Sequence, residues 1–152
     1  MTVQAYRFSA FKPFARFILE NNSIFSHVCA QYLSEARAAD VPLLRLLQHL
    51  SEKELQGVAE QSIRNFLEQS LQDNAMEDIT GQIEEWKKGN LLGIPRENIQ
   101  INDLTKLYSI RKKVMLSVLH RYTEDVHLFQ QIVNELEEFY SIVQEYAFQT
   151  YV

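Results

Sequence analysis

An apolar repeat between residues 124 and 152 constrains the fold of this chain more than any other feature. Apolar side chains recur there every three or four residues, which is the period of an α-helix with one buried face. Thr123, Glu124 and Asp125 come just before the repeat, where hydroxyl and carboxylate groups cap a helix. The sequence therefore predicts a long final helix with these apolar positions: Val126, Phe129, Ile132, Val133, Leu136, Phe139, Tyr140, Val143, Tyr146 and Ala147.

The repeat continues to the last two residues, Tyr151 and Val152. A helix at a natural chain end usually finishes in a polar stretch or a glycine. We therefore expect residues 1–152 to form a single helical domain that was cut from a larger signalling protein, with a natural chain end as the competing interpretation.

The rest of the chain shows the same helical period. Only four glycines and three prolines occur in 152 residues, too few for the frequent turns of an all-β domain. Ser51 and Glu54 have the spacing of a capping box, which marks a helix start. Ser23 can cap the second helix, Pro13 is expected to begin a helix or to kink one, and Gly89 is the expected end of the fifth helix. We expect an all-α bundle of six to seven helices, with the loop 89–101 as its main break, over these approximate ranges: 5–19, 23–39, 43–50, 52–72, 75–88, 104–122 and 126–152.

Composition and charge exclude several kinds of partner. Hydrophobic residues make up 46% of the chain, enough for one core, and the net charge of −5 disfavours binding to nucleic acid. The single cysteine, Cys29, cannot form an internal disulfide, and we expect it to be a small core residue. No stretch is long and apolar enough for membrane insertion. The sequence thus predicts a cytoplasmic protein.

The search for catalytic or metal-binding motifs finds none. The chain has no glycine-rich phosphate loop, no Gly-x-Ser-x-Gly turn and no histidine pair at metal-ligand spacing on one helix. Glu124 and His127 have the spacing of a di-iron motif, but a second copy is missing, and helix capping explains the acids better. His27 and His49 are expected to be core or boundary residues. We therefore expect a domain that is not an enzyme and holds no cofactor.

The predicted helix 104–122 carries the densest basic spot of the chain, at Arg111, Lys112 and Lys113. Its expected buried stripe consists of Leu107, Ile110, Val114, Ser117 and Val118, with Leu104, Met115 and Leu119 beside it.

A resemblance to a known family rests on three segments. They read Trp86-Lys87-Lys88-Gly89, then Ile99-Gln100-Ile101-Asn102-Asp103-Leu104 through Ser109-Ile110-Arg111-Lys112-Lys113-Val114-Met115-Leu116, and finally Tyr122-Thr123-Glu124-Asp125. This pattern resembles the helical N-terminal domains of bacterial signalling proteins. These include the non-haem globin-like domains of stressosome regulators and similar domains ahead of PAS and histidine kinase units.

The resemblance implies a globin-like or related bundle that forms a homodimer and passes a signal along its C-terminal helix to downstream domains of the same chain. A haem-binding member would need a proximal histidine before the loop, and residues 74–89 contain none. The resemblance carries over no functional residues.

The leading hypothesis is thus a sensory or regulatory domain ahead of a histidine kinase or related output. Its alternatives are a stand-alone helical adaptor, and a sensor that holds haem or another small ligand in a Phe-lined pocket. Five residues of the final helix are candidates for a dimer or signalling seam, with ordinary core as the competing interpretation: Leu136, Phe139, Tyr140, Val143 and Tyr146.

Overall fold

The computed structural model describes residues 6–88 and 101–151. These residues contain seven α-helices, one short 3₁₀ helix (Leu119–Arg121) and no strand, which confirms the all-α prediction and its six to seven helices. The α-helices have these bounds: α1 Phe11–Glu20, α2 Asn22–Ala38, α3 Pro42–Leu46, α4 Glu52–Leu71, α5 Ala75–Lys87, α6 Ile101–Leu116 and α7 Val126–Tyr151.

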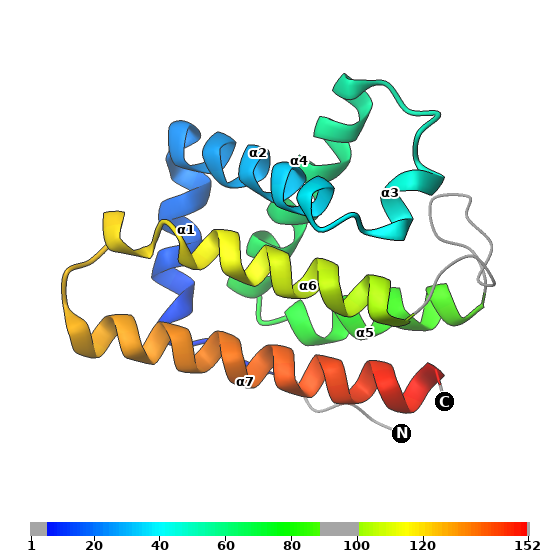
Figure 1. Ribbon diagram of the computed structural model, residues 1–152. Helices are drawn as coiled ribbons and strands as arrows, with labels where there is room; N and C mark the ends of the chain where they lie inside the picture. The colour runs from blue at the N-terminus through cyan, green and yellow to red at the C-terminus, as the bar shows by residue number, and fades with distance from the viewer. Residues whose placement is uncertain (1–5, 89–100, 152) are drawn as a thin grey trace.

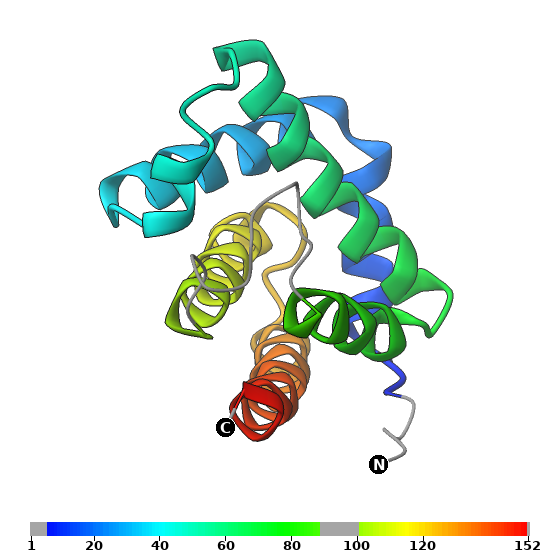
Figure 2. The ribbon, with the colours of Figure 1, turned by 90° about the vertical axis from the view of Figure 1, so that its right-hand side faces the viewer.

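The six longer helices pack in two groups of three. Helices α1, α2 and α4 contact one another, and α7 contacts both α5 and α6. Figure 1 shows α6 and α7 as an antiparallel pair, and Figure 2 shows α5, α6 and α7 almost end-on beneath the other group. The short helix α3 lies between α2 and α4 in the chain, at one edge of the molecule. Within the described residues, no helix is both long and apolar enough to cross a membrane.

Two of the predicted helix starts are confirmed by their hydrogen bonds. The amide of Glu54 donates to the Ser51 hydroxyl over 3.1 Å, while the Ser51 amide donates to the Glu54 carboxylate over 3.3 Å. At α7, the carboxylate of Asp125 accepts from the amides of His127 and Leu128. Both helices thus begin where the sequence places their caps.

The predicted cap of α2 is wrong by two residues. Asn21, not Ser23, accepts the hydrogen bond from the Ile24 amide, and the Ser23 hydroxyl donates to the same Asn21 oxygen. An asparagine side chain reaches a free helix amide as well as serine does, so the earlier of the two polar residues begins the helix.

Helix α1 begins six residues later than the sequence suggests, because a distant side chain caps it. The carboxylate of Glu135 on α7 accepts hydrogen bonds of 2.8 to 3.0 Å from the amides of Ser9, Ala10 and Phe11. Pro13 consequently stands in the first turn of α1, where a missing amide hydrogen is tolerated. Of the two roles predicted for Pro13, the structure shows a helix start and not a kink.

Helix α6 differs from its prediction in both its end and its buried face. The α-helical part ends at Leu116 and is followed by the 3₁₀ turn, so it does not continue to Tyr122. Leu107 and Ile110 are half-buried and Ser117 is exposed. Five of the predicted positions are buried, and the buried face also includes Asp103, Tyr108 and Arg111. The five are Leu104, Val114, Met115, Val118 and Leu119. The predicted loop and the Gly89 helix end lie outside the described residues.

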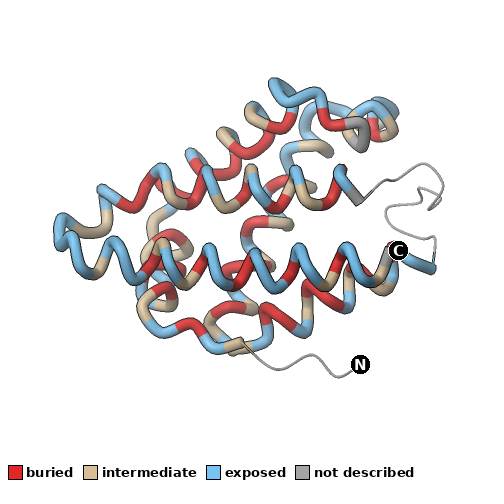
Figure 3. Tube along the Cα trace, turned by 60° about the horizontal axis from the view of Figure 1, so that its bottom comes forward, coloured by how far each residue is buried: buried red, intermediate tan, exposed pale blue. Residues whose placement is uncertain are grey.

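Five phenylalanines form the densest part of the interior, which we call the aromatic core: Phe8, Phe11, Phe14, Phe66 and Phe139. Ring centroids are 4.7 Å apart for Phe8 and Phe11, 5.1 Å for Phe8 and Phe139, and 5.6 Å for Phe66 and Phe139. These separations are typical of packed aromatic pairs. Figure 3 shows the buried positions along the inward faces of the helices, with exposed positions on their outer sides.

Candidate functional site

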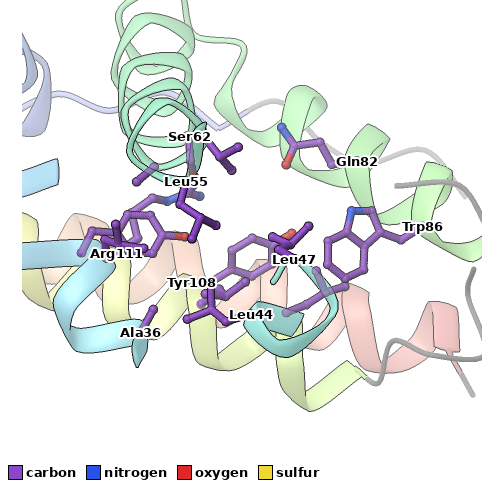
Figure 4. Close-up of a pocket in the computed structure, with 15 residues that line it drawn as sticks. Ala36, Leu44, Leu47, Leu55, Ser62, Gln82, Trp86, Tyr108 and Arg111 are labelled. Carbon is purple, nitrogen blue, oxygen red and sulfur yellow. The ribbon is translucent and has the colours of Figure 1, made fainter. Parts of the chain in front are cut away.

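A pocket opens between helices α2, α3, α4, α5 and α6, on the side away from most of the aromatic core. Its volume is about 160 Å³. The walls are mainly apolar, and Figure 4 shows Leu44, Leu47, Leu55, Trp86 and Tyr108 around the space. A concave apolar space with a few polar groups is the usual form of a small-molecule site.

Among the described residues that line the pocket, Arg111 is the one that is charged, and it is only 5% exposed. Its Nε donates to the Tyr140 hydroxyl over 3.1 Å, and its Nη1 donates to the Ser62 hydroxyl over 3.3 Å. The guanidinium carbon lies 4.5 Å from the centre of the Phe66 ring and 5.4 Å from that of Tyr108. Neutral hydroxyls and ring faces thus hold the cation in place.

No carboxylate of the described residues lies within ion-pair distance of the Arg111 guanidinium. Burial by itself would lower the pKa of Arg111, but the neighbouring Tyr140 and Tyr32 oxygens outweigh burial and raise it. The group therefore remains a cation at every physiological pH. A buried arginine usually has an anionic partner, so this arrangement is uncommon.

Asp78 on α5 supplies more distant negative charge at the pocket rim. Its carboxylate accepts from the Asn65 amide over 2.8 Å and from the Gln82 amide over 3.0 Å, and Gln82 lines the pocket. Burial raises the pKa of Asp78, while the Asn65 hydrogen bond and the Arg111 charge oppose that rise. The charge of Arg111 thus acts on Asp78, while one carboxylate oxygen of Asp78, Oδ2, accepts from both amides.

The five seam candidates lie against the interior of the chain itself. Leu136, Phe139 and Val143 are 0% exposed and Tyr140 is 7% exposed. Tyr146 is half-buried and donates to the Glu84 carboxylate over 2.6 Å. They therefore do not form an exposed surface in this chain, and their role in a dimer or in signal relay stays a prediction. Tyr140 is the member that reaches the pocket residue Arg111.

The histidines and the cysteine are not part of the pocket. The prediction that His27 and His49 are core or boundary residues is wrong: both are exposed, as are His120 and His127. Polar imidazoles lie on the outer faces of their helices because the inward positions are filled by apolar neighbours. Cys29 is a core residue as predicted, and burial raises the pKa of its thiol to about 12. No group of three potential metal ligands comes together in residues 6–88 and 101–151.

Sequence reasoning missed Arg111 because it lies in a basic triplet. Lys112 and Lys113 form ion pairs with Glu137 and Glu35, as charged surface residues do. Arg111 instead follows Leu104 and Tyr108 by seven and three positions, which places it on the buried face of α6. That spacing was the feature of the sequence that could have identified Arg111 as a buried residue. None of the described residues that line this pocket is a phenylalanine, so a Phe-lined ligand site stays a prediction.

Comparisons with known proteins give no relative for this chain. No protein-family model matches it, and neither a curated protein nor a solved structure is similar to it. The globin-like arrangement and the resemblance to signalling domains therefore stay predictions, and the argument about function rests on the pocket.

Proposed function

We propose that this chain is a regulatory domain that senses a small molecule in the Arg111 pocket and relays its presence through α7. The observation that carries this proposal is the hydrogen bond between Arg111, which lines the pocket, and Tyr140, which belongs to α7. A ligand that moves the guanidinium must also change the contacts of Tyr140.

Two further contacts tie α7 to pocket walls. Tyr146 of α7 donates to Glu84 of α5, and Lys112 of α6 lies 2.9 Å from Glu137 of α7. Helices that pack side by side commonly shift by one or two ångströms in switching proteins. Occupancy of the pocket would therefore be converted into a small displacement of α7 against α5 and α6.

The groups that line the pocket favour binding over catalysis. They include no carboxylate, histidine or cysteine of the described residues, which are the usual acids, bases and nucleophiles of enzymes. Arg111, Ser62 and Gln82 can orient a ligand, but none of them is an effective base at neutral pH. The domain we propose is thus a sensor and not an enzyme.

The output of this sensor is, in our proposal, a downstream signalling unit such as a histidine kinase of the bacterial cytoplasm, and the domain acts as a homodimer. The resemblance of residues 86–89 and 99–125 to such N-terminal domains supports this part of the proposal. Light scattering on the purified chain tests the dimer: a mass of twice 17.8 kDa is expected, and a monomer at all concentrations would contradict it.

The relay is tested by hydrogen exchange of the α7 amides with the pocket filled. Toluene and benzoate are suitable probes, because a cavity of about 150 Å³ accepts benzene. We expect a bound probe to slow exchange in α7 around Tyr140, in addition to changes in the pocket walls.

The variant Ala36→Leu, which fills the pocket, should abolish that response, whereas Ala38→Leu on the exposed side of the same helix should retain it. If neither probe alters exchange in α7 of the unmodified chain, the proposed function is wrong.

A further inference from the structure

We propose that the pocket takes a small monocarboxylate with an apolar body about the size of a benzene ring, and that Arg111 binds its carboxylate. This inference rests on the proposed function only in treating the pocket as a ligand site. It adds the charge, the size and the orientation of the ligand.

The charge of the ligand follows from the hydrogen bonds of Arg111. A guanidinium carries five N–H donors. In the described residues, only the Nε bond to Tyr140 and the Nη1 bond to Ser62 are made, and both acceptors are neutral hydroxyls. A carboxylate would supply the missing negative charge and accept from the two terminal nitrogens at once, which is the preferred geometry of an arginine pair.

The body of the ligand follows from the walls and the volume. Apart from Arg111, Ser62 and Gln82, the space meets mainly leucine and aromatic side chains, which would be left without contacts by a bare inorganic anion. The volume of about 160 Å³ is close to that of a cavity that holds benzene. It is too small for a nucleotide, a haem or a long acyl chain.

The orientation follows from the two ends of the pocket. Figure 4 shows Arg111 and Ser62 at one end and Trp86 and Gln82 at the other, with Leu47 and Tyr108 between them. The carboxylate therefore points toward α4 and α6, and the apolar body lies between α3 and α5.

The experiment compares benzoate with benzamide, its neutral counterpart of nearly the same shape, by titration calorimetry and by chemical shifts of the Trp86 indole. We expect benzoate to bind about ten-fold more tightly, a difference of about 1.4 kcal/mol, since hydrogen bonds to charged groups are stronger than those between neutral groups. This comparison uses the unmodified chain, so it does not depend on the folding of any variant. Equal binding of the two compounds, or no binding of benzoate, would overturn the proposal.

The residue itself is tested with Arg111→Met. A methionine fills similar space without charge, and replacing a buried charge by an apolar residue is often tolerated. We expect this variant to lose the preference for benzoate and to bind toluene at least as well. Lys106→Met, an exposed cation on the same helix, should bind benzoate like the unmodified chain. If Arg111→Met folds and still prefers benzoate, Arg111 does not bind the carboxylate.

The outcomes separate this inference from the proposed function. Toluene binding that slows exchange in α7, together with failure of benzoate to bind, would disprove the carboxylate ligand and leave the sensor intact. Benzoate binding that leaves α7 unchanged would support the ligand class and disprove the relay.

Discussion

The two ends of the interior differ in how they are filled. In the aromatic core, Phe8 and rings from α1, α4 and α7 pack with centroids 4.7 to 6.3 Å apart, and Phe11, Phe14 and Phe139 are 0% exposed. Between α2, α3 and α5, leucines surround an open space of about 160 Å³. Protein interiors are normally close-packed, so the two ends of this interior differ in how well their side chains fill the space.

Arg111 stands at the boundary between these two regions. One face of its guanidinium lies over Phe66 of the aromatic core, while the same side chain lines the pocket. Ring contacts and hydroxyl groups make this cation tolerable without a carboxylate from the described residues. The aromatic core thus supports the charged group that we propose to bind the ligand.

The largest expected difference between the two regions is in the stability lost when a buried leucine is shortened to alanine. Leu136 and Leu47 are 0% and 3% exposed, but Leu136 lies on the buried face of α7 near Phe139 and Leu47 lines the pocket. We expect Leu136→Ala to lower the free energy of unfolding by about 4 kcal/mol and Leu47→Ala by about 2 kcal/mol, because only the first opens a new cavity. Urea unfolding followed by circular dichroism measures both values. Equal losses would mean that the pocket end is packed as tightly as the aromatic core.

Enlarging a buried alanine to leucine should destabilise the aromatic core but stabilise the pocket end. Ala15 of α1 is 0% exposed and Ala36 of α2, which lines the pocket, is 2% exposed. We expect Ala15→Leu to destabilise the fold by about 2 kcal/mol, since it has no space to enter, and Ala36→Leu to stabilise it by about 1 kcal/mol. Thermal unfolding checks both. A destabilised Ala36→Leu would indicate that the pocket is not free to be filled.

The smallest expected effect on stability appears only at alkaline pH and concerns the buried thiol of Cys29. Burial raises the pKa of Cys29 to about 12 from an ordinary value of 9.0. The unfolded chain therefore loses this proton from about pH 9, while the folded chain keeps it until about pH 12, so stability must fall as the pH rises across that window. Urea unfolding between pH 7 and pH 11 should show a shallower decline for Cys29→Ala. Parallel declines in both proteins would show that the thiol is accessible to solvent.

The repeating parts of this fold could be predicted from the sequence, because local patterns determine them. The period of α7, the capping box at Ser51 and Glu54, and the burial of Cys29 each depend on residues within a few positions. The buried face of α6 was predicted only in part, because Tyr108 and Arg111 were not among the predicted buried positions. Apolar pattern alone cannot identify a cation that is held by rings and hydroxyls from other helices.

The position of the pocket could not be predicted, because its walls come from five helices and no single segment of the sequence determines how those helices pack together. The start of α1 escaped prediction for the same reason. Its cap, Glu135, is separated from Phe11 by 124 residues, and no local signal marks such a pair.

The cap at Glu135 has a consequence for the order in which the chain folds. During synthesis α1 emerges before α7, yet the three amides at its start acquire their acceptor only after α7 has been made and has docked. The hydroxyl of Tyr6 donates to the backbone oxygen of Glu135, and this hydrogen bond likewise can form only after α7 has docked. Contacts between such distant parts of a chain form slowly, because the entropy cost of closing a long loop comes before the contacts can stabilise the fold. Helix α1 leaves the ribosome well before α7 and is completed only after α7 has docked, so the aromatic side chains of α1 stay partly uncovered in the nascent chain until α7 arrives.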